Sequence, residues 1–134
     1  MTTRTLYRAA DSDDVRVGYS FAGRLDDARE YLDNPGFGGG TLYRASVDLA
    51  DMIDLTDDCW DTLSEAIGET VEPMHHQYHF PSTVTASDKI CAKLAAAGYR
   101  WARIIDDYPE GCITYVPLTD DAADAAESAM TEIE

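Results

Sequence analysis

Residues 99–118 read YRWARIIDDYPEGCITYVPL, and this stretch decides the fold of the chain. Two runs within it, Tyr99 to Ile105 and Cys112 to Leu118, are rich in the β-branched and aromatic residues that favour strands. Between them, Asp106 to Pro109 supplies the aspartates and the proline that are typical of a turn. The stretch therefore predicts two strands that return on each other as a hairpin-like pair.

The rest of the chain alternates between strand and helix patterns. Period-two or β-branched runs predict four further strands, at residues 5–10, 15–21, 41–49 and 52–55. Apolar residues spaced by three and four predict three helices, at residues 25–32, 59–67 and 88–97. Gly98 follows the last of these in the position where a left-handed residue ends a helix. This mixed order predicts an α+β fold.

The length of 134 residues fits one compact domain, because two independent cores would each be close to the size that needs disulfides or metals. We assign residues 1–118 to this domain. Residues 119–134 are rich in alanine and acid, and we expect an acidic C-terminal helix or frayed tail without chemistry.

The charge of the chain is strongly negative. Asp and Glu number 26 against 10 Lys and Arg, which gives a formal net charge of −16. Binding to nucleic acid needs clustered cations that neutralise phosphates, so a direct nucleic-acid binder is excluded, and attraction to anionic membranes is disfavoured. The acidity serves either solubility or the docking of an acidic face on a basic protein.

The cysteines and histidines do not form a recognisable metal or disulfide pattern. Cys59, Cys91 and Cys112 are an odd number without a CxxC spacing, which favours a reducing cytoplasm. Residues 75–79 hold three histidines, and two of them have the spacing of some zinc sites, but no glutamate of a metalloprotease pattern lies between them. We expect no metal. The chain also shows no leader and no apolar run approaching 18 residues, so neither secretion nor a membrane span is predicted.

An ordered series of polar residues points to chemistry on NAD. Arg8 lies on the first predicted strand, Tyr19 and Ser20 lie on the second, and Glu110 precedes the last. Arginine can grip a diphosphate or ribose through two charge-assisted bonds, and a carboxylate can stabilise the oxocarbenium-like charge that develops when ADP-ribose is transferred. In the alternative interpretation Arg8 is a surface ion-pair partner and Glu110 a turn residue.

Two aromatic residues are candidates for stacking on the nicotinamide ring. Tyr31 lies on the first predicted helix, which comes after the second strand. Phe37 lies in the glycine-rich segment that follows this helix. Both could equally belong to the core or its rim. Residues 36–40 lack the lysine of a phosphate-binding loop, so the glycines alone indicate no nucleotide site.

This arrangement resembles the ADP-ribosyltransferase superfamily. The motifs that carry the resemblance are Leu6-Tyr7-Arg8-Ala9, then Ser20-Phe21-Ala22 with Ala28 and Tyr31, and finally Ala97-Gly98-Tyr99 and Glu110 before the last strand. The resemblance implies split antiparallel β-sheets flanked by helices around an NAD crevice. It also implies that Arg8 binds NAD and that Glu110 is the catalytic carboxylate.

Two departures from the family pattern affect the site. This chain has Ser20-Phe21-Ala22 where family members often have Ser-Thr-Ser, so its second strand has fewer hydroxyl groups. Gly111 and Cys112 separate Glu110 from its strand, so Asp106 and Asp107 remain alternative carboxylates.

A narrower resemblance links the chain to small phage-encoded ADP-ribosylating anti-CRISPR proteins, which also carry an acidic residue, glycine and cysteine before the last strand. We therefore expect an NAD-dependent mono-ADP-ribosyltransferase that modifies a protein, such as a nucleic-acid-binding defence complex, in the cytoplasm of a bacterial or phage-infected host cell. Two alternatives remain open. One is a non-catalytic acidic inhibitor that occupies the nucleic-acid groove of a partner, and the other is a toxin that hydrolyses NAD.

Overall fold

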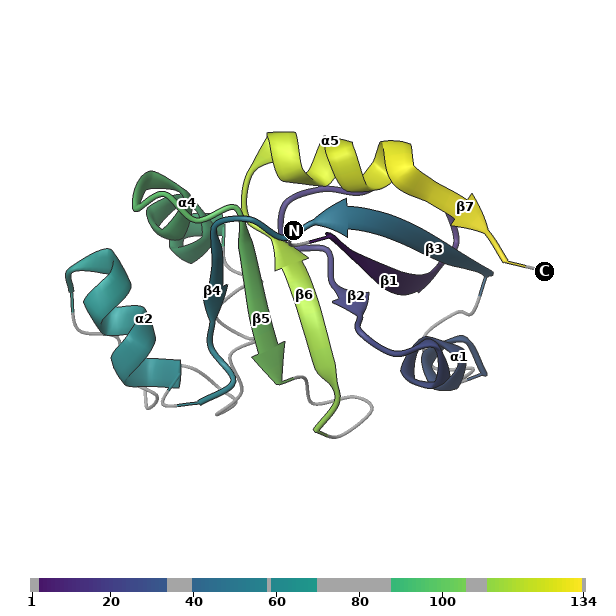
Figure 1. Ribbon diagram of the computed structural model, residues 1–134, viewed down its shortest axis with the longest axis horizontal. Helices are drawn as coiled ribbons and strands as arrows, with labels where there is room; N and C mark the ends of the chain where they lie inside the picture. The colour runs from purple at the N-terminus through teal and green to yellow at the C-terminus, as the bar shows by residue number, and fades with distance from the viewer. Residues whose placement is uncertain (1–2, 34–39, 58, 70–87, 106–110, 134) are drawn as a thin grey trace.

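A computed structural model describes residues 3–33, 40–57, 59–69, 88–105 and 111–133 of the chain. Figure 1 shows a twisted sheet with helices on both sides. The described strands are β1 (Thr3–Ala10), β2 (Phe21–Ala22), β3 (Thr41–Asp48), β4 (Met52–Asp54), β5 (Trp101–Ile105), β6 (Ile113–Pro117) and β7 (Met130–Glu132). The described helices are α1 (Leu25–Asp33), α2 (Cys59–Ile67), α4 (Asp88–Ala96) and α5 (Asp120–Ala129). The predicted α+β class is confirmed.

The strands form one seven-stranded sheet in the order β4-β5-β6-β2-β1-β3-β7. The predicted hairpin-like pair is confirmed, because β5 runs antiparallel to β6 from Trp101↔Pro117 to Ile105↔Ile113. The two-residue strand β2 lies between β6 and β1, and it pairs with β1 only at Tyr7↔Ala22. The first two strands of the chain and its late strand β6 are therefore neighbours in space.

The sheet differs from the expected split antiparallel pair in two respects. It is continuous through β2, although that short strand is the one link between the β4-β5-β6 half and the β1-β3-β7 half. It is also mixed, since β4 and β5 are parallel. A parallel pair requires a long crossover connection, and the chain passes through α2 and α4 between these two strands.

The second predicted strand, at residues 15–21, is wrong except at its last residue. The structure gives residues 14–20 no strand, and the backbone turns at Gly18, whose φ is +91°. The Gly18 N–H donates to the Pro117 carbonyl at 3.1 Å, and the Val15 N–H donates to Glu127 Oε1 at 2.9 Å. Turn and side-chain partners thus replace a strand ladder here.

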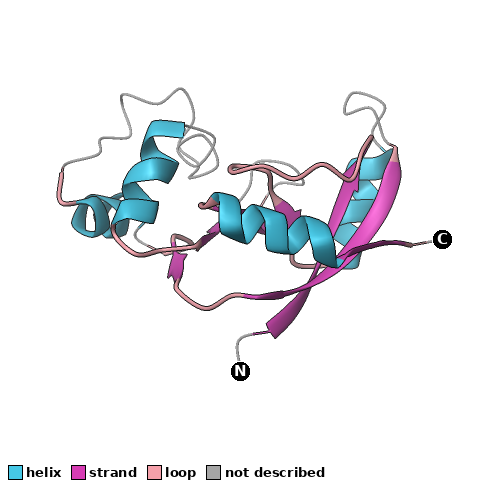
Figure 2. Cartoon of the chain, turned by 90° about the horizontal axis from the view of Figure 1, so that it is seen from above, coloured by secondary structure: helices cyan, strands magenta, loops and turns pink. Residues whose placement is uncertain are grey.

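Helices cover both faces of the sheet. Alternation along the strands sends Leu6, Ala45 and Trp101 to one face, where they pack with alanines of α5. The opposite face packs Ala9 and Leu42 against α1 and, at the other end, packs Ile53, Ala102, Ile104 and Val116 against α2 and α4. Seen from above in Figure 2, α1 lies at the opposite end of the molecule from α2 and α4.

The acidic segment after residue 118 contributes to the core. Thr119 caps α5 by accepting a hydrogen bond from the Ala122 N–H at 3.1 Å, and the small residues Ala122, Ala123 and Ala126 are buried against the sheet. The chain then forms β7, which pairs with β3 and which the sequence did not predict. The tail therefore completes one edge of the sheet.

Candidate functional site

A cavity of about 80 Å³ lies where β1, β2 and β6 meet α1. Because β2 has only two residues, β1 has no ladder partner on this side beyond Tyr7, and the sheet opens there. The cavity is lined by residues from all four elements and their flanks, namely Tyr7, Arg8, Ala9, Ser20, Ala22, Asp27, Ala28, Tyr31, Cys112 and Thr114.

Arg8 is held at this opening by carbonyl and aromatic groups. Its Nη1 donates to the Ser20 carbonyl oxygen at 2.7 Å. Its guanidinium carbon lies 4.9 Å from the centroid of the Tyr19 ring and 5.8 Å from that of Phe21, within the range of cation–π attraction. Contacts of this kind fix the position of the guanidinium without neutralising its charge.

The electrostatic state of Arg8 is unusual for a surface arginine. Burial lowers the pKa of Arg8 below its ordinary value, and Tyr31, Tyr19 and Asp14 act in the opposite direction. Within the described residues Arg8 forms no ion pair with a carboxylate, and its buried Nε has no hydrogen-bond partner. A buried donor without an acceptor is costly, which makes this N–H an unusual feature of the site.

Several predicted site residues come together here. Arg8, Ser20 and Tyr31 all line the cavity, although they come from β1, the segment before β2, and α1. Tyr19 contacts the Arg8 guanidinium but does not line the cavity, and its side chain is exposed. The predicted residues Phe37 and Glu110, and the alternative carboxylates Asp106 and Asp107, lie outside the described residues.

Three polar residues of the cavity wall were missed by the sequence analysis: Asp27, Cys112 and Thr114. Thr114 is 5% exposed and stands out as a polar residue within the apolar strand β6, which was the available signal. Cys112 has a buried, reduced thiol and follows Glu110 by two residues. The beginning of β6 therefore contributes to the same cavity as Arg8 and Ser20.

No group of three potential metal ligands occurs in the part of the chain that the structure describes. The candidate histidines, His75, His76 and His79, lie outside that part. Among the described helices, none has the length and apolarity needed to cross a bilayer.

Comparison with known proteins adds no relative: the chain matches no family model, no curated protein and no solved structure.

Proposed function

We propose that this protein is an NAD-dependent mono-ADP-ribosyltransferase that modifies a protein target. The observation that supports the proposal best is the strand order β6-β2-β1. In this order the three strands are neighbours, and a cavity opens among them. The sequence has Arg8 on β1, Ser20 directly before β2 and Glu110 shortly before β6.

The cavity suits one part of the dinucleotide. Whole-ligand pockets usually measure about 300–1,000 Å³. A cavity of about 80 Å³ is therefore too small for the whole of NAD and takes at most one ring or a polar group at the ring's edge. Tyr31 supplies an aromatic wall, and Ser20 and Thr114 supply hydroxyls beside it. The remaining parts of NAD then lie outside the cavity.

Arg8 is suited to bind an electron-rich oxygen of NAD. Its guanidinium is anchored on the Ser20 carbonyl through Nη1, and among the described residues the buried Nε–H has no acceptor. A phosphate or ribose oxygen would satisfy that donor, and an arginine makes such bonds with fixed geometry. Positioning of this kind lowers the entropic cost of reaching the reactive geometry.

The reaction replaces one bond to the nicotinamide ribose by another. The bond between the anomeric carbon and the nicotinamide nitrogen breaks, nicotinamide leaves with the bonding electrons, and positive charge develops on the ribose. In the proposal, Glu110 stabilises that charge as a carboxylate. A nucleophile of the target then bonds to the anomeric carbon and loses its proton. With water as nucleophile the same site would hydrolyse NAD.

Turnover of NAD tests the proposal. The protein is incubated with NAD in bacterial cell extract, and released nicotinamide is quantified for the unaltered protein and Glu110→Gln. Exposed Glu65 provides a matched control as Glu65→Gln. We expect release by the unaltered protein and by Glu65→Gln, and a loss of about a hundredfold or more for Glu110→Gln. Equal release by all three proteins would refute the proposal.

A second measurement separates transfer from hydrolysis. NAD labelled on its adenylate portion is used in the same extract, and the label is followed into protein and into free ADP-ribose. Label on protein supports the transferase, whereas label exclusively in free ADP-ribose identifies an NAD-hydrolysing toxin that uses the same residues.

A second candidate function is favoured by the outer face of α5. Its exposed carboxylates Asp120, Asp121, Asp124 and Glu127 follow helical spacing along one side. Asp14 and three of these acids line a groove of about 660 Å³ beside the helix. This surface would suit a non-catalytic inhibitor that occupies the nucleic-acid groove of a partner protein.

The two functions differ in their response to salt and to Arg8. An acidic inhibitor would bind its partner with an affinity that falls steeply as salt rises, and Arg8→Ala would leave that affinity unchanged. A transferase would lose NAD turnover in Arg8→Ala. Pull-down from extract at low and high salt, with both proteins, discriminates between them.

A further inference from the structure

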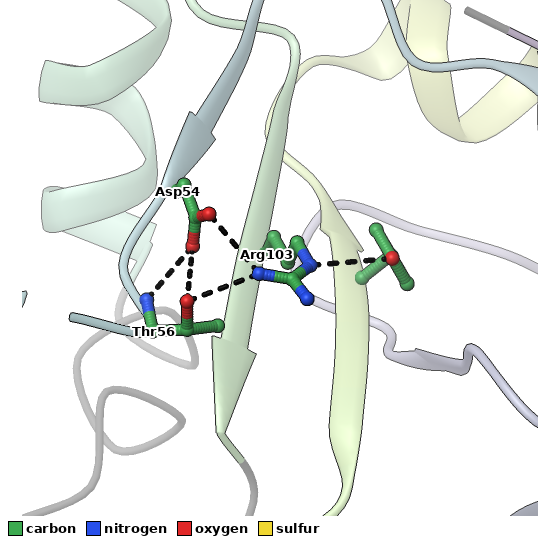
Figure 3. A network of polar contacts seen from close by, with 4 residues as sticks. Asp54, Thr56 and Arg103 are labelled. Carbon is green, nitrogen blue, oxygen red and sulfur yellow. Dashed lines mark hydrogen bonds and ion pairs between the residues drawn. The ribbon is translucent and has the colours of Figure 1, made fainter.

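Arg4 and Arg103 lie on the face of the sheet that α5 covers in part. By strand alternation Arg4 shares this face with Leu6 and Arg8, and Arg103 shares it with Trp101, whereas Ala9, Ala22 and Ala28 of the cavity wall belong to the α1 side. Between Arg4 and Arg103 lies Tyr115 of β6, whose side chain is 3% exposed. Figure 3 shows Arg103 on β5, with contacts to Asp54 and Thr56 on one side and a contact that crosses β6 on the other.

Arg103 belongs to a hydrogen-bonded network that uses only some of its guanidinium N–H groups. Its Nη1 donates to Asp54 Oδ2 and to Thr56 Oγ1, both at 3.0 Å, and its Nε donates to the Tyr115 hydroxyl at 3.3 Å (Figure 3). The hydrogen bond to Tyr115 raises the pKa of Arg103, so the group is firmly cationic. Within the described residues Nη2 has no partner.

Arg4 is positioned on the other side of Tyr115 without any carboxylate. Its guanidinium carbon lies 5.3 Å from the centroid of the Tyr115 ring, and its Nη2 donates to the Gly23 carbonyl at 3.3 Å. In the described part of the chain its Nε and Nη1 have no acceptor. A full positive charge is therefore held in place by a ring and a carbonyl, in a protein with 26 acidic residues.

In the part of the chain that the structure describes, several donors of this cluster have no acceptor. They are Nε–H and Nη1–H of Arg4, Nη2–H of Arg103 and the hydroxyl hydrogen of Tyr115, whose oxygen accepts from Arg103. Both arginines contact Tyr115, so their remaining donors lie around one side chain, and such donors suit an oxyanion. Arginine forks match phosphate oxygens especially well.

We propose that Arg4, Tyr115 and Arg103 form a phosphate-binding site, distinct from the cavity at Arg8 and independent of the proposed transferase activity. The ligand is a phosphate group, either free or carried by a nucleotide. Asp54 neutralises part of the Arg103 charge, so Arg4 provides most of the attraction.

Gly23 allows the two sides of the site to approach each other. A Cβ on Gly23 would lie 3.0 Å from Tyr115 Cε1 and 3.3 Å from Arg4 Nη2. Its φ is not in the left-handed region, so the backbone accepts alanine. Gly23→Ala should therefore displace Arg4 from the ring without removing any charge, which separates geometry from net charge.

Calorimetric titration with inorganic pyrophosphate and with ADP at low salt tests the site. The matched control is Arg44→Ala, which removes one exposed arginine of β3 and so changes the net charge equally. We expect both probes to bind the unaltered protein, and Arg4→Ala to weaken both by about tenfold while Arg44→Ala leaves them unchanged. Tighter binding of ADP than of pyrophosphate would indicate a nucleotide ligand, and equal binding would indicate free phosphate; both results support the site.

Two further variants keep the test decisive. Gly23→Ala should weaken pyrophosphate binding several-fold. Arg4→Ala should weaken it by the same factor whether or not Arg8 is also replaced by alanine, which distinguishes this site from the cavity. Thermal unfolding followed by circular dichroism verifies that each variant is folded. Absence of pyrophosphate binding to the unaltered protein, or equal weakening by Arg4→Ala and Arg44→Ala, would overturn the proposal.

Discussion

The close approach of β1 and β3 at Gly40 makes a quantitative prediction about stability. Gly40 has a φ of +90°, and a Cβ there would lie 2.4 Å from the Ala10 carbonyl oxygen and 2.7 Å from its carbon. These two strands pair up to Ala10↔Thr41, next to Gly40, and Arg8 pairs with Tyr43 two rungs further in. Alanine at position 40 would therefore force apart the end of the ladder that positions Arg8.

The expected loss of unfolding free energy has a conformational part and a steric part, and a substitution at a second glycine measures the conformational part alone. Gly98 has a similar φ of +104°, but a Cβ there meets nothing within 4 Å. Gly98→Ala should therefore lose only the conformational part, about 1–2 kcal/mol of unfolding free energy. Gly40→Ala should lose this and an overpacking part of about 1–3 kcal/mol as well.

Urea denaturation followed by circular dichroism measures both losses on the same footing. The predicted result is a clearly larger loss for Gly40→Ala than for Gly98→Ala. Equal losses, or a smaller loss for Gly40→Ala, would refute the steric account of the β1–β3 closure.

Three further predictions follow from single contacts. Glu127→Ala should destabilise the protein by about 1–3 kcal/mol, because the buried Val15 N–H loses its acceptor, whereas Glu127→Gln keeps an acceptor and should cost less; urea denaturation compares them. Leu94→Ala should cost about 2–5 kcal/mol in the same assay, since Leu94 of α4 is fully buried in the core beside the sheet. Burial acts to raise the pKa of Asp54, but hydrogen bonds from Thr56 and the Arg103 charge outweigh it, so the pKa lies below its ordinary 3.8. The carboxylate therefore stabilises the protein above about pH 4 and loses this effect as the pH falls through the lowered pKa. The difference in unfolding free energy between the unaltered protein and Asp54→Asn should shrink on acidification. A difference independent of pH would contradict this.

Elements defined by local pattern were predictable from the sequence. The helices α1, α2 and α4 and the strands β1, β3, β5 and β6 lie within two residues of their expected bounds. Each has a clear apolar period or a strong turn signal at its ends, which depends on neighbouring residues alone. Gly98, for example, has the positive φ expected after a helix.

Features that depend on distant partners were not predictable. Residues 15–20 alternate like a strand, but Gly18 bonds to Pro117 and Val15 bonds to Glu127, both about a hundred residues away. The strand β7 exists because the edge of β3 is available after α5. Parallel pairing of β4 with β5 likewise leaves no local signal.

The candidate site was predictable in part for the same reason. The grouping of Arg8, Ser20 and Tyr31 around one cavity agrees with the ordered series in the sequence, while their roles stay predictions. Thr114 and Cys112 join the cavity through the pairing of β2 with β6, which no spacing along the chain indicates.

Calorimetric titration of NAD into the unaltered protein, Arg8→Ala and Arg44→Ala examines the NAD site without the target and without turnover. We expect saturable binding to the unaltered protein and to Arg44→Ala, and at least tenfold weaker binding to Arg8→Ala, in which the proposed phosphate site at Arg4 is still present. Binding of NAD to Arg8→Ala as tight as to the unaltered protein, or no binding to any of the three, would contradict the proposed NAD site.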